Sequence, residues 1–310
     1  LWHTLSLHDA LPICFAVHIL QIFGSKGEIW LRQLPDSLQK AANEWSLQLT
    51  RTLPSLNYNY LAAGTRSGGQ PIILKAGIPT RELQTEIRAL RHYQGFGAVQ
   101  LLESNSKNGL LLLERVIPGR QLKNLTDNLR EVKAAAEVIR KLHQKPCDQP
   151  EAYPSLQDWC QGFERVKAIV DPEQDARLAD QILKAETLSQ KILSEKSRNY
   201  LLHGDLHHEN ILFSDTGSWT AVDPKGVIGE AAAEPGAFLV NPYPNLTSEV
   251  DLSALTSARI AGFSKLLQLD PDRVRSWGYL RAVLSAVWSW EERRPQSVSY
   301  FLTCADAFNI

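Results

Sequence analysis

Apolar runs separated by short polar turns mark the first third of the chain and predict two β-hairpins. Four of these runs are expected to be strands, at 57–65, 70–77, 98–104 and 109–116. RSGGQ joins the first two, and Asn108-Gly109, a dipeptide that favours tight hairpin turns, joins the last two. This part of the chain is therefore expected to form an antiparallel sheet.

Apolar residues spaced three or four apart predict helices on both sides of these strands. Within 34–50 this spacing predicts a helix that is capped by Asp36 or Ser37. Further helices are expected at 81–93, at 127–144, within 155–197 and over most of 247–310. The prolines and polar residues between these segments mark the connecting loops.

A polar stretch, LLHGDLHHENILF at 201–213, interrupts the helical part of the chain. It reads as a loop between two short strands, YLL and NILF. A third strand, within 218–226, is expected to end at Asp223. The loop is unusual because it carries three histidines, an aspartate, a glutamate and an asparagine between apolar runs.

The order of these elements predicts an α+β fold with two lobes. A small antiparallel β-rich lobe with one helix is expected at 15–117, and a large, mainly helical lobe at 118–310. IPG at 117–119 marks the break between them. A small β-rich lobe joined to a helical lobe that carries a polar loop suggests a nucleotide cleft.

The opening residues, LWHTLSLHDALPI, differ from the rest of the chain. The sequence contains no methionine, and a common sequencing adapter can encode the stretch from His3 to Ile13. The segment lacks a basic region at its start, so it makes a poor signal peptide. We expect residues 1–14 to be a non-native, adapter-derived leader.

Composition excludes several classes of partner. The net charge is −1, and no basic stripe is interleaved with aromatic residues, so neither nucleic acid nor an anionic membrane is expected to bind. The four cysteines lack metal-ligand spacing, which favours a reducing, cytoplasmic compartment. No apolar run reaches the roughly 18 residues of a membrane span. A small-molecule partner is expected, and the oligomeric state stays open.

Four polar residues carry the candidate chemistry. Asp205 and Asn210 share one loop, and Asp223 follows at the end of the next strand. Their side chains offer oxygen ligands, which suit Mg²⁺ and not zinc. Lys75 ends an apolar strand, where its ammonium group suits a phosphate. The alternative for Lys75 is an ordinary lysine at a strand end.

The motif HGDLHHEN followed by VDP resembles the catalytic loop and metal-binding segment of the aminoglycoside phosphotransferases, which share the protein-kinase-like fold. NYNYLAAG, LLLLERVIPG and DPKGVIGE narrow the resemblance to the streptomycin 6-phosphotransferases and hydroxyurea phosphotransferases. The resemblance covers roughly residues 24–300. It implies ATP- and Mg²⁺-dependent phosphoryl transfer to a hydroxyl of an aminoglycoside, with streptomycin as the type.

The resemblance also implies a role for each matching residue. Asp205 is the catalytic base or orienter of the acceptor hydroxyl, and Asn210 and Asp223 hold Mg²⁺. Lys75 neutralises the α- and β-phosphates, and Glu86 holds Lys75 by an ion pair. These parts suffice physically, because phosphoryl transfer depends mainly on positioning and charge neutralisation.

Helix phase favours Glu86 over Glu82 as the partner of Lys75. Glu86 borders the apolar stripe that contains Leu83 and Leu90, whereas Glu82 falls outside it. A carboxylate that faces inward needs a partner, and Lys75 is the available cation.

Two departures from the protein-kinase pattern indicate a small-molecule kinase. Gly204 stands where protein kinases have an arginine that reads a phosphorylated activation loop. Pro224 stands where they have phenylalanine, and it predicts an extended backbone at Asp223.

The histidines of the loop allow two interpretations. His203, His207 and His208 have a spacing that could ligate zinc if they lay on a helix, but Gly204 and the apolar flanks favour a loop. In that loop His203 is expected to support the backbone from beneath by hydrogen bonding.

Four further residues are weaker candidates. Glu114 and Val116 are expected at a hinge whose backbone meets the adenine, with a plain strand end as the alternative. Glu291 and Glu292 can contact a cationic acceptor, with ordinary surface charges at a helix end as the alternative. Trp288 is expected in the core.

Three other functions stay open at this point. The first is a kinase of the same fold that acts on hydroxyurea or another metabolite. The second is a catalytically silent nucleotide-binding module. The third is a zinc hydrolase that uses the histidines.

Overall fold

The structure is a computed structural model that describes residues 12–54, 56–243 and 251–310. Most of the expected leader, residues 1–11, lies outside the described residues. Its last two residues, Ile13 and Cys14, begin the first helix. The foreign origin of the leader stays a prediction.

The chain divides into two compact units. The first contains the residues up to Gly95 and Val99–Val116, and the second contains Phe96–Ala98 and Ile117–Ile310. The short segment Phe96–Ala98 belongs to the second unit because Ala98 bridges to Ala221. The division after Val116 lies one residue before the expected boundary.

An antiparallel sheet forms the centre of the first unit, and its described strands follow the order β1-β2-β3-β5-β4. These strands are β1 (Leu47–Thr52), β2 (Tyr60–Arg66), β3 (Pro71–Ala76), β4 (Leu101–Asn105) and β5 (Leu110–Glu114). Both predicted hairpins are confirmed, as β2–β3 and β4–β5. The second turn needs its glycine, because Gly109 has a φ of +69° and a Cβ there would lie 1.9 Å from the Gly77 carbonyl oxygen.

Helix α1 (Ile13–Glu44) covers far more of the chain than expected. Asp36 and Ser37, the predicted caps, lie inside this helix, so that prediction was wrong. Pro35 also lies inside it, and Gly24, with φ 53° and ψ −130°, kinks it. The apolar residues of α1 pack on the sheet along much of its length, and this burial outweighs the local capping signal.

The expected helix within 34–50 also ends earlier than predicted. Helix α1 stops at Glu44, Ser46 takes a left-handed φ of 55°, and β1 begins at Leu47. The last residues of that segment therefore pair with β2 instead of continuing the helix. Alternation of Leu47 and Leu49 with polar residues suits a strand, and both leucines pack in the core of this unit.

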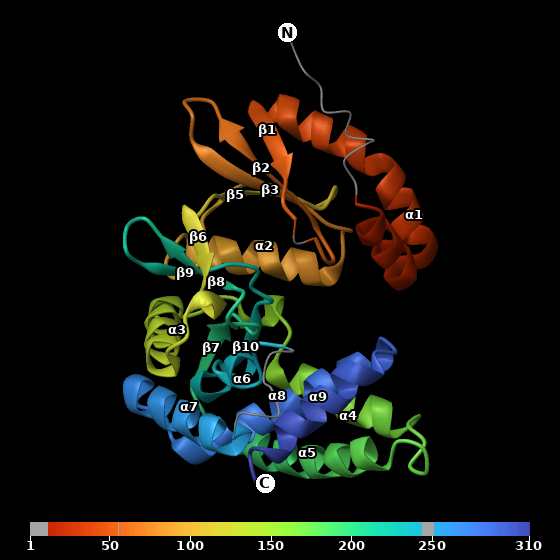
Figure 1. Cartoon of the computed structure of the whole chain (residues 1–310), viewed down its shortest axis with the longest axis vertical. Coiled ribbons are helices and arrows are strands. Elements are labelled where there is room, and N and C mark those ends of the chain that lie inside the picture. Colours follow the sequence, from red (N-terminus) through yellow and green to blue (C-terminus); the bar gives the residue numbers. More distant parts are fainter. Residues whose placement is uncertain (1–11, 55, 244–250) are drawn as a thin grey trace. The chain divides into compact units, whose positions relative to one another are not determined.

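Helix α2 (Arg81–Tyr93) forms where it was predicted. The Thr80 side chain caps it by accepting a hydrogen bond from the Leu83 N–H. Its predicted apolar stripe is buried. In Figure 1, α1 and α2 lie against the sheet of the first unit. Ile72 and Leu74 of β3 pack in the cluster with α1.

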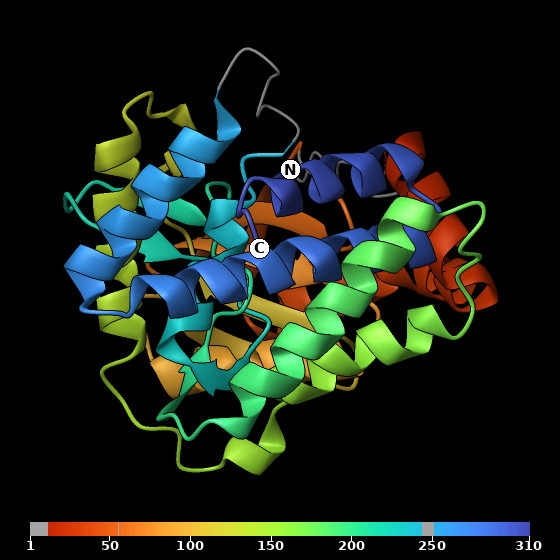
Figure 2. The ribbon, with the colours of Figure 1, turned by 90° about the horizontal axis from the view of Figure 1, so that it is seen from below.

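The second unit is mainly helical. Its described α-helices are α3 (Asn128–Leu142), α4 (Leu156–Lys167), α5 (Ala176–Ser194), α6 (Gly236–Leu239), α7 (Leu252–Leu267), α8 (Pro271–Glu291) and α9 (Pro295–Asp306). Helix α8 is central, because it packs on α4, α5, α6, α7 and α9. Figure 2 shows α8 and α9 side by side, with α5 running across them.

Two small sheets lie within the helical unit. One pairs β7 (Asn199–Leu202) with β10 (Val227–Glu230), and the other has the order β6-β8-β9. The strands of the second sheet are β6 (Pro118–Gln121), β8 (Ile211–Ser214) and β9 (Trp219–Ala221). The sequence did not predict β6 or β10. Strand β9 also ends at Ala221, before the expected end at Asp223.

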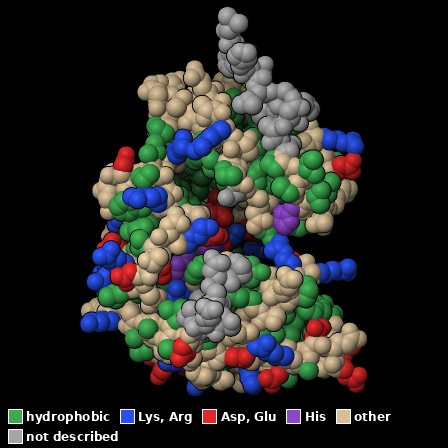
Figure 3. Space-filling view, viewed as in Figure 1, with side chains coloured by type: hydrophobic (Ala, Val, Ile, Leu, Met, Phe, Trp, Pro, Cys, Tyr) green, Lys and Arg blue, Asp and Glu red, His purple; other side chains and the backbone are tan. Residues whose placement is uncertain are grey.

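The surface agrees with the near-neutral net charge. On the face shown in Figure 3, Lys and Arg side chains are interspersed with Asp and Glu. Within the described ranges, none of the helices is long and apolar enough to span a bilayer.

Candidate active site

The polar loop 203–210 joins strands of the two small sheets in the second unit. Strand β7 before the loop pairs with β10, whereas β8 after it pairs with β6 and β9. Ile211 faces Ala221 across β8 and β9, and the Val222 N–H donates to the Asn210 carbonyl at 2.9 Å. The hairpin therefore returns the chain beside the loop, as the sequence predicted.

Asn210 is held in a defined orientation. Its side-chain Nδ2 donates to the Asp205 carbonyl oxygen at 3.0 Å and lies 3.2 Å from His207 Nε2. Because the amide nitrogen faces the Asp205 carbonyl oxygen, the amide oxygen points away from it. An amide oxygen is a ligand that Mg²⁺ accepts in proteins.

The backbone at Asp223 differs from the prediction. Its φ is 62°, in the left-handed region, so the extended conformation expected before Pro224 was wrong. The reason lies two residues further along the chain, where the Lys225 N–H donates to the His203 carbonyl at 2.8 Å. That bond requires a sharp turn after β9, and aspartate tolerates left-handed backbone better than most residues.

His203 supports the loop from beneath, as predicted. The ring is fully buried, its Nε2 lies 2.9 Å from the Val222 carbonyl oxygen, and its Nδ1 accepts from the Asp205 N–H at 3.2 Å. These partners require Nε2 to carry the proton. Burial lowers the pKa of His203, which keeps the ring neutral in this role.

Glu234 is a second support of the loop. Its carboxylate accepts from the His203 N–H at 2.9 Å and the Gly204 N–H at 3.0 Å, and it lies 3.0 Å from His143 Nε2. Burial alone would raise the pKa of Glu234. The hydrogen bond and charge of His143, together with the Gly204 N–H, outweigh burial, so the pKa is lowered.

The Asp205 carboxylate is paired with an arginine from α8. Arg281 Nη2 donates to Asp205 Oδ1 at 2.6 Å, and Arg281 Nη1 donates to the Gly204 carbonyl oxygen at 2.6 Å. Burial would raise the pKa of Asp205, but the positive charges of His207, Arg281 and Lys225 outweigh it and lower that pKa. Asp205 is therefore ionised in the folded protein near neutral pH.

The first unit forms the predicted ion pair between a strand and a helix. Lys75 Nζ lies 2.7 and 2.8 Å from the two carboxylate oxygens of Glu86, and both residues are at most 5% exposed. Glu82 is exposed, so the choice of Glu86 was right. Ile72 and Leu74 face the core formed with α1, and the alternation of a strand turns Lys75 to the other face, toward α2.

Comparison with protein families matches residues 46–293 to the family described as aminoglycoside/hydroxyurea antibiotic resistance kinase. The chain belongs to this family. Streptomycin 6-kinase of Streptomyces glaucescens is 25% identical over 91% of this chain and 91% of that protein. Hydroxyurea phosphotransferase of Kitasatospora aureofaciens is 29% identical over 88% of this chain and 78% of that protein. The predicted family and the phosphotransferase class are confirmed.

Solved structures show the same fold as this antibiotic resistance kinase. A ternary complex of aminoglycoside phosphotransferase APH(4)-Ia with ADP and hygromycin B has a TM-score of 0.64 at 15% identity, over 87% of this chain and 96% of that chain. An amicoumacin kinase with AMP-PNP and Ca²⁺ has a TM-score of 0.61 at 16% identity, over 88% and 93%. The predicted protein-kinase-like α+β fold is confirmed.

The predicted hinge residues of the kinase lie at the end of the first unit. Glu114 is the last residue of β5, where its N–H donates to the Gln100 carbonyl and its side chain accepts from the Gln100 N–H. Val116 is the last residue of this unit. Contact of this backbone with adenine stays a prediction.

The two glutamates predicted for the acceptor lie at the C-terminal end of α8. Glu291 accepts from Arg165 Nε at 2.7 Å and Nη2 at 3.2 Å. Glu292 lies 3.1 Å from Arg294. The Glu291 carboxylate is engaged with Arg165, so an acceptor cation would compete with an existing pair. Their role toward an acceptor stays a prediction.

The histidines of the loop have separate partners. His203 bonds to the backbone, and His207 lies beside Asn210. His208 is fully buried, stacks on Phe238 at 4.0 Å, and has Nε2 3.4 Å from Glu131. Within 12–54, 56–243 and 251–310, no three or more His, Cys, Asp or Glu side chains are grouped to hold a metal ion.

Sequence reasoning missed Arg281 and Glu234. Both had a detectable signal, because each is a charged residue in an otherwise apolar stretch, and a charge in such a place requires a partner. Trp288 was also misplaced. It is half-buried, not core, and it lies beside Arg281 with its ring centroid 5.2 Å from the guanidinium.

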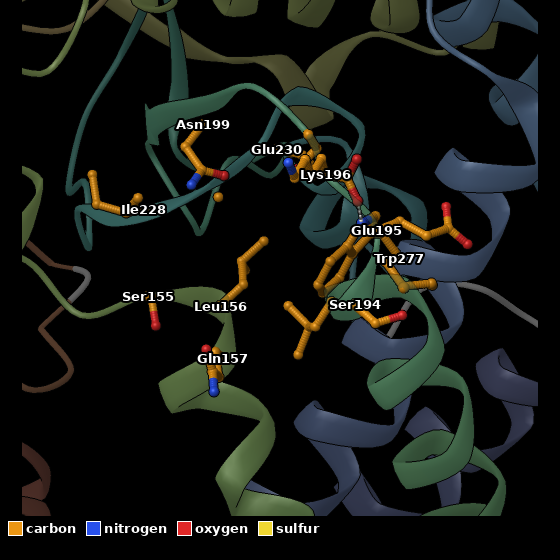
Figure 4. A pocket seen from close by; sticks show the side chains of 14 residues that line it. Ser155, Leu156, Gln157, Ser194, Glu195, Lys196, Asn199, Ile228, Glu230 and Trp277 are labelled. Atoms are coloured by element: carbon orange, nitrogen blue, oxygen red, sulfur yellow. Dashed lines mark hydrogen bonds between the residues drawn. The ribbon is translucent and has the colours of Figure 1, made fainter.

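A separate pocket lies on another part of the second unit. Figure 4 shows its lining side chains, which include Trp277, Glu230 and Glu195. Glu230 accepts from Arg273 at 2.7 and 3.1 Å and from the Trp277 indole N–H. The lining does not include any residue of the loop 203–210. Glu195 and Glu230 both pair with Arg273, which indicates a structural role for these two carboxylates.

Proposed function

We propose that the protein transfers the γ-phosphoryl group of ATP, together with Mg²⁺, to a hydroxyl of an aminoglycoside of the streptomycin type. The observation that carries the proposal is the loop 203–210. Glu234 and His203 anchor this loop, Asp205 and Asn210 lie on it, and the following hairpin returns Asp223 beside it.

The proposed step forms one bond and breaks another at the γ-phosphorus. The acceptor hydroxyl oxygen bonds to it while its bond to the β–γ bridging oxygen breaks, which yields ADP and a phosphate ester. Asp205 accepts the hydrogen bond of the hydroxyl and then its proton. A carboxylate with a lowered pKa suffices, because the transition state is loose and little charge must develop on the nucleophile before attack.

Residues of the first unit serve the nucleotide in this proposal. Lys75 neutralises the α- and β-phosphates, and Glu86 holds its ammonium group. The backbone from Glu114 to Val116 receives the adenine. Burial of the Lys75–Glu86 pair supports this role, since a buried lysine at a strand end needs a function or a partner to offset its desolvation.

The donor set fits a magnesium ion. Asn210 offers its amide oxygen and Asp223 its carboxylate, and Mg²⁺ commonly uses one or two carboxylates plus substrate phosphates. A bound ion supplies charge neutralisation to the phosphate oxygens. The amicoumacin kinase with AMP-PNP and Ca²⁺ supports a divalent ion with a nucleotide in this fold.

The nature of the acceptor rests on the relatives. Streptomycin 6-kinases from two Streptomyces species cover more than nine-tenths of this chain, which supports a streptomycin-type acceptor. The hydroxyurea phosphotransferase relative supports a second candidate, phosphorylation of the hydroxyl of hydroxyurea. A small neutral acceptor of that kind needs no acidic pocket.

A coupled assay of ADP release tests both candidates. Streptomycin, other aminoglycosides and hydroxyurea are offered in turn, and the product is identified by phosphorus NMR and mass spectrometry. We expect acceptor-dependent turnover that Asp205→Asn abolishes and that Asp215→Asn, an exposed aspartate in the β8–β9 turn, preserves. Full kcat in the Asp205 variant would remove that residue from the mechanism. No turnover with any acceptor would favour a silent nucleotide-binding module.

A further inference from the structure

A single arginine is enclosed beside the candidate catalytic carboxylate. The Arg281 guanidinium lies 5.2 Å from the ring centroid of Trp288 and 5.7 Å from that of Trp159. The two indoles meet edge to face, with centroids 5.5 Å apart. Two guanidinium nitrogens of Arg281 donate to Asp205 Oδ1 and the Gly204 carbonyl oxygen, both at 2.6 Å. The guanidinium therefore sits in a cage of two rings and two oxygens.

The cage holds the arginine in one place. Its side chain is 14% exposed, and its Nε is buried with no hydrogen-bond partner among the described residues. The stem packs against Gly236, where a Cβ would lie 3.1 Å from Arg281 Cβ. A larger residue at 236 would therefore crowd the stem. A buried Nε without a partner costs free energy, so the other contacts of the Arg281 side chain must offset that cost.

Gly204 makes room for this arrangement. A Cβ at 204 would lie 2.9 Å from Trp159 and 2.8 Å from Val227. Trp159 therefore packs directly over the glycine, and Arg281 from α8 reaches the carbonyl of the same residue. A guanidinium is thus supplied to this loop from a distant helix.

We propose that Arg281 is the positioning residue for the acceptor-side carboxylate, which it holds through Oδ1 so that Oδ2 is turned to the acceptor hydroxyl. This inference rests on the proposed function. Two parallel N–H donors fix the orientation of Asp205 relative to its own backbone, since one bonds to the carboxylate and the other to the preceding carbonyl. Trp159 and Trp288 fix the guanidinium in turn by cation–π contact.

The first test compares variants of α8 in the full chain with saturating ATP. Arg281→Ala is expected to lower kcat by roughly 100-fold, as a loss of positioning does, with an unchanged KM for ATP. Arg281→Lys keeps a charge but not the fork, so its kcat should lie between those of Arg281→Ala and the unaltered protein. Arg275→Ala is the matched control, because this arginine of the same helix bonds to the Phe308 carbonyl.

The second test asks whether free guanidinium can replace the missing side chain in Arg281→Ala. Arg281→Ala leaves a space bounded by Asp205 Oδ1, the Gly204 carbonyl and two indoles. Millimolar guanidinium chloride should restore part of the lost kcat and change the tryptophan fluorescence of this variant alone. Urea, which has a similar planar shape without charge, and sodium chloride of equal ionic strength should do neither.

The outcomes separate this inference from the proposed function. If the unaltered protein phosphorylates no acceptor, the proposed function fails, and the fluorescence response to guanidinium still decides whether the cage exists. An unchanged kcat in Arg281→Ala, or equal effects of guanidinium and urea, would overturn the role of Arg281. If Arg281→Ala does not fold, Arg281→Lys decides, since full kcat in that variant contradicts a need for two parallel donors.

Discussion

Lys75 Nζ lies within 2.8 Å of both carboxylate oxygens of Glu86, and the pair is buried between β3 and α2. Breaking one partner of such a pair leaves an uncompensated buried charge, whereas an exposed pair contributes little. The pair therefore matters for stability, whatever its contribution to catalysis.

Glu86→Gln should lower the free energy of unfolding by about 3 kcal/mol, because it removes the carboxylate that faces the buried Lys75 ammonium group. In the proposed role it should also raise the KM for ATP, since the ammonium group is no longer held. Urea unfolding and steady-state kinetics measure the two effects. The control is Glu82→Gln, an exposed glutamate one turn earlier on the same helix. Equal stability of the two variants would contradict a strong pair.

Local sequence patterns predicted the Lys75–Glu86 pair of the candidate site. The stripe of α2 decided between Glu86 and Glu82, and Lys75 was identified by its place at the end of an apolar strand, because both signals depend only on neighbouring residues. They could not predict that Arg281 pairs with Asp205, because the two residues lie 76 positions apart along the chain. A contact of that separation depends on how helices pack, which sequence spacing does not encode.

Sequence patterns likewise predicted the elements of the fold that have local signals and missed those that depend on distant contacts. Both hairpins had turn signals, so β2–β3 and β4–β5 were found. Strand β6 begins with Pro118-Gly119, residues that normally interrupt strands, and it forms because it pairs with the distant β8. Helix α1 runs through Pro35, since burial of its apolar face overrides the local preference.

Protonation of a buried histidine should make the fold sensitive to acid. Burial lowers the pKa of His208 to about 4, with Glu131 opposing and the charges of Arg259 and His207 adding to the shift. In the unfolded chain a histidine has a pKa of about 6.5. The unfolded state therefore gains a proton as the pH falls from about 6.5 to about 4, while the folded state does not.

The free energy of unfolding should consequently fall across this pH window, by roughly 3 kcal/mol from this residue. Urea unfolding at several pH values measures the slope. His208→Asn, which cannot be protonated, should show a flatter dependence between these pH values. An equal slope in the variant would assign the effect to other groups.

Buried and exposed cysteines should differ in their reactivity toward thiol reagents. Cys160 and Cys304 are buried, and burial raises their pKa to about 12 and about 11. Burial also raises the pKa of Cys147, which is partly exposed, whereas Cys14 is exposed. Because the thiolate is the reactive form, only Cys14 and Cys147 should react with an aromatic disulfide reagent in the native protein. Mass spectrometry of the labelled chain identifies the sites. Rapid native labelling of Cys160 would contradict this packing.

Alanine substitutions at two glycines separate the cost of steric overlap at the loop 203–210 from the cost of backbone strain. Gly204 and Gly217 have φ values of +80° and +78°, but a Cβ at Gly217 meets nothing within 4 Å, whereas one at Gly204 meets Trp159 and Val227. Gly217→Ala should therefore cost about 1–2 kcal/mol of stability from backbone strain alone. Gly204→Ala should cost about 1–3 kcal/mol more, because it overpacks the contact, and should also lower kcat by displacing the loop. Thermal unfolding and kinetics of both variants check this. Equal losses of stability would show that Trp159 yields easily, and then the packing over Gly204 would not hold the loop in place.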